Sequence, residues 1–136
     1  MAVEYILLSH GKLSSGMKDT VEMIIGETKN LHSIGMDPDT GTDKLIQDVK
    51  SLMAEHSGAK FVLLTDLFGG SVNNRVYEQF QSDPNVEIVA GMNLSLVLEM
   101  VLQPEAGRES CLSAIDLARE NMIYMRDMVF ESEDDE

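Results

Sequence analysis

The shortages in this sequence are as informative as its contents, beginning with cysteine and basic residues. The chain has 136 residues and a single cysteine, Cys111, so it can form neither an intramolecular disulfide nor a cysteine metal cluster. Only 10 lysines and arginines stand against 24 aspartates and glutamates, which gives a formal net charge of -14. Nucleic acid is therefore excluded as a good partner, because phosphate backbones are bound by Lys and Arg. The same charge favours a partner with a basic surface.

The sequence also lacks a long apolar run. No stretch approaches the ~20 apolar residues of a membrane-spanning helix, and the chain starts with a strand pattern instead of a signal peptide. These absences predict a cytoplasmic protein with no direct membrane insertion. A length of 136 residues fits one domain with an ordinary buried core. We expect that domain over residues 1–130, followed by an acidic tail over 131–136.

Strand and helix patterns alternate along the chain. Apolar strand patterns cover roughly residues 3–9, 31–34, 61–66 and 86–90. Helical spacing of apolar residues follows each strand, with Ser14, Ser15 and Ser71 as expected helix caps. The alternation predicts a doubly wound α/β fold, with a mainly parallel sheet of about four strands and helices on both faces.

Two of the predicted strands end in residues that suit phosphoryl chemistry. His10 comes at the end of the first strand, and Asp66 at the end of the third. Because the carboxyl ends of parallel strands line the ligand crevice, both side chains are expected at one edge of the sheet. Neutral imidazole is a good nucleophile toward an activated phosphoryl group, and a carboxylate that accepts its other N–H fixes the tautomer. We therefore predict His10 as the nucleophile and Asp66 as its orienting residue.

The turn after Asp66 is predicted to bind phosphate. The backbone N–H groups of Gly69, Gly70 and Ser71 come at the start of a helix, where unpaired amides and the helix dipole favour anions. The Ser71 hydroxyl can add another donor. Each signal alone also fits an ordinary turn or cap; their coincidence at one sheet edge favours a functional site.

Other polar residues are assigned no such role. His32 is predicted within a short strand as a surface or boundary residue, and His56 at a helix end where its positive form meets the helix dipole. Asp37, Asp39 and Asp43 lack the ligand spacing of a calcium loop. We predict no metal site and no cofactor.

Four segments together resemble one known family. They are Ser9-His10-Gly11, Met23-Ile24-Ile25-Gly26-Glu27, Thr65-Asp66-Leu67-Phe68-Gly69-Gly70-Ser71 and Gly91-Met92-Asn93-Leu94. The family is the enzyme IIA domain of the mannose-type (mannose/fructose/sorbose) branch of the bacterial sugar phosphotransferase system. The resemblance runs from the N-terminus to about Leu102.

This resemblance implies a phosphoryl carrier. His10 matches the family's phosphorylated histidine, Asp66 its orienting aspartate and Ser71 its phosphate-binding serine. Such a domain accepts phosphate from the phosphocarrier protein HPr and passes it to a histidine of the IIB protein, which serves the IIC and IID membrane components in sugar uptake. Val72 and Ser95 replace two prolines usual in the family, so we expect unchanged chemistry with less rigid helix starts.

The resemblance also implies a homodimer in which a C-terminal strand adds to the partner's sheet edge, with Asp127–Phe130 as the candidate strand. The chain contains no IIB domain, so IIB is expected as a separate polypeptide. Two alternatives stay open. One is the phosphoryl-carrying subunit of dihydroxyacetone kinase, against which the Leu67–Ser71 loop argues. The other is a non-catalytic regulatory module that binds phosphate reversibly at the strand ends.

Overall fold

The computed structural model of the chain describes residues 2–130, so the predicted acidic tail lies outside the described residues. The strands are β1 (Val3–His10), β2 (Leu31–Met36), β3 (Lys60–Thr65) and β4 (Val86–Ala90). The helices are α1 (Leu13–Ile25), α2 (Gly41–Glu55), α3 (Ser71–Phe80), α4 (Leu94–Val101) and α5 (Arg108–Glu120), followed by one 3-10 turn at Met125–Asp127. No helix among residues 2–130 is long and apolar enough to cross a bilayer.

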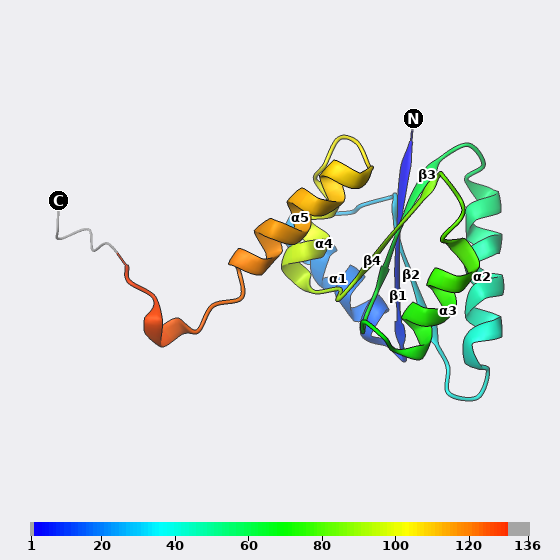
Figure 1. Cartoon of the computed structure of the whole chain (residues 1–136), viewed down its shortest axis with the longest axis horizontal. Coiled ribbons are helices and arrows are strands. Elements are labelled where there is room, and N and C mark those ends of the chain that lie inside the picture. Colours follow the sequence, from blue (N-terminus) through cyan, green and yellow to red (C-terminus); the bar gives the residue numbers. More distant parts are fainter. Residues whose placement is uncertain (1, 131–136) are drawn as a thin grey trace.

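The four strands form one sheet in the order β2-β1-β3-β4, and every neighbouring pair is parallel. The central strands β1 and β3 carry nearly continuous apolar runs, as expected for strands that are covered on both faces. The predicted α/β class is therefore confirmed. Because all strands run the same way, their carboxyl ends meet at one edge of the sheet, the lower edge in Figure 1.

Helices cover both faces of the sheet. Helices α2 and α3 lie on one face, and α1, α4 and α5 lie on the other (Figure 1). Alternate residues of β1 serve the two layers: Ile6 and Leu8 pack in the α2 and α3 core, whereas Tyr5 and Leu7 pack in the other. This alternation follows from the two-residue period of a strand. It also fixes which face each polar residue of β1 occupies.

The predicted helix caps are wrong in position. Ser14 and Ser15 lie inside α1, which starts at Leu13, and Ser71 is the first residue of α3 after the N-cap Gly70. The start of α1 is instead tied to the preceding strand, because the Ser14 N–H donates to Oγ of the buried Ser9 at 2.8 Å. A residue of β1 therefore satisfies an amide at the start of α1 across a tight turn. The spacing of residues in the sequence does not reveal this contact.

The turn that carries His10 packs directly against β2. The Gly11 N–H donates to the Met36 carbonyl at 2.9 Å, and the backbone of Gly11 is left-handed with φ +54°. A Cβ on Gly35 would overlap the Gly11 carbonyl oxygen. Gly35 therefore allows the carboxyl ends of β1 and β2 to approach closely, and it sets the backbone just after His10.

The predicted C-terminal strand, Asp127–Phe130, does not form within this single chain. Met125–Asp127 make a 3-10 turn, and the segment after α5 extends away from the body of the protein (Figure 1). Its large apolar side chains are exposed, with Val129 at 90%. A strand needs a neighbour to pair with, and no strand in the described part of the chain pairs with this segment. Pairing with a partner subunit stays a prediction.

We expect Gly35→Ala to destabilise the fold, because the new methyl group would overlap the Gly11 carbonyl oxygen. Overpacking of this kind costs about 1–3 kcal/mol of unfolding free energy, measurable by urea denaturation. Gly16→Ala is the matched control, since Gly16 lies in α1 with nothing near its added Cβ. That control should be neutral or stabilising. Equal losses in both variants would contradict the close approach at Gly35.

Candidate active site

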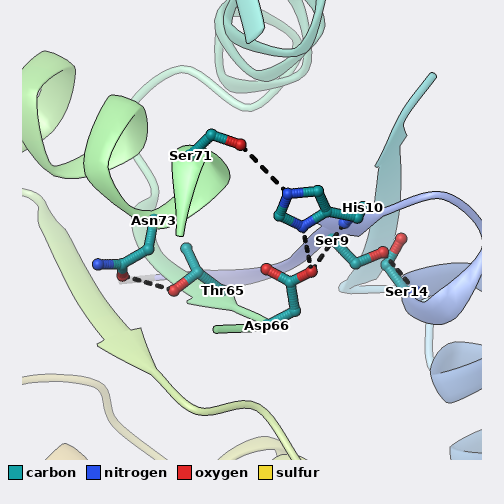
Figure 2. A network of polar contacts seen from close by, with 7 residues as sticks. All are labelled: Ser9, His10, Ser14, Thr65, Asp66, Ser71 and Asn73. Atoms are coloured by element: carbon teal, nitrogen blue, oxygen red, sulfur yellow. Dashed lines mark hydrogen bonds and ion pairs between the residues drawn. The ribbon is translucent and has the colours of Figure 1, made fainter. Parts of the chain in front are cut away.

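The carboxyl ends of β1 and β3 bring His10 and Asp66 into direct contact (Figure 2). One oxygen of Asp66, Oδ2, accepts two hydrogen bonds from His10, one from the backbone N–H and one from ring Nδ1, each at 2.8 Å. An ionised carboxylate only accepts, so the contact assigns the ring proton to Nδ1. The other ring nitrogen, Nε2, is left with a free lone pair.

The strand register explains this meeting. In the parallel β1 and β3 pair, Leu8 lies opposite Thr65, so the residues just beyond them lie together at the sheet edge. The Thr65 hydroxyl donates to Asn73 Oδ1 at 2.7 Å in a buried contact, which ties the start of α3 to the end of β3 (Figure 2). The sheet therefore sets the positions of the His10 imidazole and the Asp66 carboxylate, and the Thr65–Asn73 contact sets the position of α3 beside them.

Ser71 completes the group on the other side of the imidazole. Its Oγ lies 3.2 Å from His10 Nε2, and since Nε2 carries no proton, the serine hydroxyl is the donor. The imidazole thus lies between Asp66 and Ser71 (Figure 2). The structure brings together the three side chains that the sequence predicted at one sheet edge.

The turn before α3 offers fewer free amides than its sequence indicates. The Gly70 N–H donates to the Leu67 carbonyl at 3.0 Å, so this amide is already used inside the turn. The amides of Gly69 and Ser71 have no acceptor within residues 2–130. Gly69 has a left-handed backbone with φ +81°, a conformation for which glycine is favoured. Within the described residues, the turn therefore supplies two free amides, those of Gly69 and Ser71, while the Ser71 hydroxyl donates to His10 Nε2.

Burial differs sharply between the two members of the central pair. The Asp66 side chain is 8% exposed, whereas the His10 side chain is 46% exposed. Burial raises the pKa of the Asp66 carboxyl, but the backbone and side-chain hydrogen bonds from His10, together with the positive charge that its ring carries when protonated, outweigh that effect. The net result is a pKa of Asp66 below its ordinary value. The carboxylate stays ionised under an imidazole that solvent and a partner can reach.

Exposed apolar side chains flank the site. Leu67 and Phe68 lie between Asp66 and the glycine turn, and Phe68 is 83% exposed. Exposed apolar groups that gather beside polar ones are typical of interaction surfaces. The site therefore combines a reachable imidazole with a surface suited to a protein partner.

Two residues that position the site were missed by sequence analysis. Ser9 anchors the start of α1 directly after the His10 turn, and Gly35 admits the Gly11 carbonyl. Both act through contacts with residues on a neighbouring turn or strand. A serine inside a strand and a glycine in a short strand carry no local signal of such roles.

Comparison with known proteins places the chain in a family. The sequence profile of the family described as "PTS system fructose IIA component" matches residues 4–114. The chain belongs to this family. It is 33% identical over 100 residues to the sorbose-specific EIIA component of Lacticaseibacillus casei, covering 74% of this chain and 72% of that protein. It is 28% identical over 117 residues to the sorbose-specific EIIA component of Klebsiella pneumoniae, covering 86% and 82%.

A solved structure extends the likeness to nearly the whole fold. The PTS IIA protein associated with the fucose utilization operon of Streptococcus pneumoniae superposes with a TM-score of 0.82 at 26% identity, covering 93% of this chain and 95% of that one. The family predicted from four short motifs is thereby confirmed. The chain is a mannose-family PTS enzyme IIA, and thus a phosphotransferase component.

The lowered pKa of Asp66 predicts an acid-dependent share of stability. Because the folded-state pKa lies below the ordinary 3.8, this share is present above about pH 3.8 and is lost as the pH falls through the folded-state value. Urea denaturation should therefore show a higher unfolding free energy for wild type than for Asp66→Asn at pH 6, and this difference should shrink as the pH is lowered to 3. The control is Asp116→Asn on the exposed side of α5. A gap between wild type and Asp66→Asn that does not vary with pH would contradict the assignment.

Proposed function

We propose that this enzyme IIA carries a phosphoryl group on His10, accepting it from HPr and passing it to a IIB protein. IIB then phosphorylates the sugar during uptake through the IIC and IID membrane components. The observation that carries the proposal is the line Asp66–His10–Ser71, in which one ring nitrogen is held by a carboxylate and the other faces a hydroxyl.

The transfer step follows from the tautomer. The lone pair of His10 Nε2 attacks the phosphorus of the donor phosphohistidine, a new N–P bond forms, and the donor imidazole leaves with the old bond pair. The His10 ring gains positive charge as the bond forms. Asp66 stabilises that charge through Nδ1 at 2.8 Å, and the Nδ1 proton stays in place throughout. The second transfer, to IIB, is the same exchange with His10 as the leaving group.

Donors for the phosphoryl oxygens lie beside the attacking nitrogen. The Ser71 hydroxyl is 3.2 Å from Nε2, and a rotation about its Cα–Cβ bond turns it toward an incoming oxygen. The same phosphoryl oxygens are attracted by the amides of Gly69 and Ser71 and by the positive N-terminal end of the α3 dipole. A carrier must stabilise the transition state without trapping its phosphohistidine, and the exposure of His10 serves that need.

Docking is expected to be transient and to use one surface for both partners. HPr and IIB must each bring a histidine to the exposed His10, so their footprints overlap around Leu67 and Phe68. The net charge of -14 favours partners with a basic rim and fast, steered encounters. We also propose a homodimer, in which a partner subunit covers the exposed apolar residues after α5.

Intact-mass spectrometry after incubation with phosphoenolpyruvate, enzyme I and HPr is the direct test. We expect an acid-labile gain of one phosphoryl group that His10→Ala abolishes, because no other imidazole faces Asp66 and Ser71 within the described residues. Nitrogen-15 NMR of the product should place the phosphorus on Nε2. His56→Gln is the matched control and should be labelled like wild type. Reversible phosphate binding without a covalent adduct would favour the regulatory module instead.

Substitutions beside the imidazole should slow transfer without preventing folding. Asp66→Asn is expected to lower the transfer rate by about 100-fold or more, because an amide does not balance the charge that develops on the ring. Ser71→Ala should lower it by about 10- to 100-fold, and Ser71→Thr should recover most of the rate because it keeps the hydroxyl. Rapid-quench measurement of transfer from phosphorylated HPr gives these rates. An unaffected Ser71→Ala rate would mean that the amides alone hold the phosphoryl group.

A further inference from the structure

A second cluster of ionisable side chains lies at the opposite end of β1 from His10. Glu4 near the start of β1, His32 near the start of β2, and His56 at the C-cap of α2 offer ligand atoms that all lie within 4.8 Å of one another. The Glu4 Oε1 atom is 2.7 Å from His32 Nε2 and 3.5 Å from His56 Nδ1. These are two of the three histidines in the protein, and the proposed phosphoryl transfer uses neither.

The fold explains why these residues converge. His32 lies opposite Ile6 in the β1 and β2 register, and Glu4 shares the face of Ile6 by the two-residue period of the strand. That face is the one that α2 covers. Helix α2 ends at Glu55, which places His56 over the same corner of the sheet. The two imidazole rings have centroids 5.2 Å apart.

The charge of Glu4 lacks a permanent counter-charge. Its side chain is only 9% exposed, and within residues 2–130 its ion-pair partners are the two histidines, with no lysine or arginine among them. A carboxylate so far out of water needs hydrogen bonds or a cation to offset its desolvation. A neutral imidazole supplies only a hydrogen bond, whereas a bound cation would supply charge.

We propose that Glu4, His32 and His56 form a site for a divalent transition-metal ion, with Zn²⁺ as the best fit. Imidazole nitrogen and carboxylate oxygen are typical zinc ligands, at about 2.0–2.2 Å from the metal. Tetrahedral bonds of that length place neighbouring ligand atoms about 3.3 Å apart. The two observed separations from Glu4 Oε1, 2.7 and 3.5 Å, lie on either side of that value. Small side-chain rotations would therefore exchange the Glu4–His32 hydrogen bond for two metal bonds.

An ion can reach the cluster from solvent. His32 also lines an open groove of about 490 Å³ on the surface between β2 and α2, together with the acidic side chains of Asp48 and Glu55. Three protein ligands leave a fourth position for water or for another donor from this groove. The groove thus supplies an entry path for an ion. Of its charged lining residues, Glu55 adds negative charge. Asp48, by contrast, is paired with Lys44 at 2.6 Å, and Lys18 is basic.

A bound ion would join the start of β1, the start of β2 and the end of α2. Its binding free energy would add to the stability of the fold, since an ion that binds only the folded state stabilises it by an amount that rises with the logarithm of its free concentration above Kd. Glu4 and His10 are six residues apart on one strand, or about 20 Å. Metal binding should therefore leave the transfer chemistry at His10 unchanged, and the inference stands whether or not the proposed function is correct.

Metal titration of the full-length, tag-free protein tests this inference. Calorimetry with Zn²⁺ and visible absorption with Co²⁺ should show one saturable equivalent in wild type, with the absorption bands of a tetrahedral nitrogen and oxygen site. We expect His32→Gln, His56→Gln and Glu4→Gln each to weaken binding by about 10-fold or more. His10→Gln is the matched control, because it removes the remaining histidine and should bind Zn²⁺ like wild type.

Thermal unfolding gives an independent measurement. At the same free Zn²⁺ concentration, Zn²⁺ should raise the melting temperature of wild type and of His10→Gln clearly more than that of His56→Gln. His56 is at a helix end with its side chain 34% exposed, so its variant should fold even if Glu4→Gln does not. Absence of saturable binding, equal binding in all variants, or loss of binding only in His10→Gln would each overturn the proposal.

Discussion

The site depends on one oxygen atom that accepts two hydrogen bonds from one residue. Asp66 Oδ2 holds the backbone N–H of His10, which fixes where β1 ends, and the ring Nδ1–H, which fixes how the imidazole is turned. Together these bonds decide the tautomer and aim Nε2 at Ser71. In the proposed transfer, the nucleophile His10 is therefore oriented before any phosphate arrives, so that little of the transfer barrier is spent on arranging it.

The parallel sheet makes that contact possible, and tight turns keep it in place. Neighbouring parallel strands end at the same edge, so His10 and Asp66 meet although 56 residues separate them. Three contacts then hold the surrounding backbone: Ser9 with α1, Gly35 with the Gly11 carbonyl, and Thr65 with α3. The contacts with Asp66 and Ser71 set the strand position and the ring orientation of the exposed imidazole.

Both ends of β1 pair a buried carboxylate with imidazole, but they differ in how many imidazoles pair with it and in how exposed these are. At the carboxyl end, the buried Asp66 is paired with an exposed imidazole that a partner can reach. At the amino end, the buried Glu4 is paired with two imidazoles that are themselves largely covered. The first arrangement suits repeated exchange of a group with other proteins. The second suits a ligand that stays bound. The first arrangement therefore agrees with the proposed phosphoryl transfer, and the second with the proposed metal site.

Local sequence patterns were enough to predict the order of elements and the candidate residues at the strand ends. Apolar periodicity is local, so the α/β class, the strand at 86–90 and the positions of His10 and Asp66 could be predicted from it. Tertiary structure decided what depends on distant partners: the Ser9 cap of α1, the use of the Gly70 amide inside its turn, and the convergence of Glu4 with His32 and His56. The segment Asp127–Phe130 marks the same boundary, because a strand exists only with a neighbour to pair with. Local spacing encodes which residues can form an element, whereas register and packing decide which side chains from different elements meet.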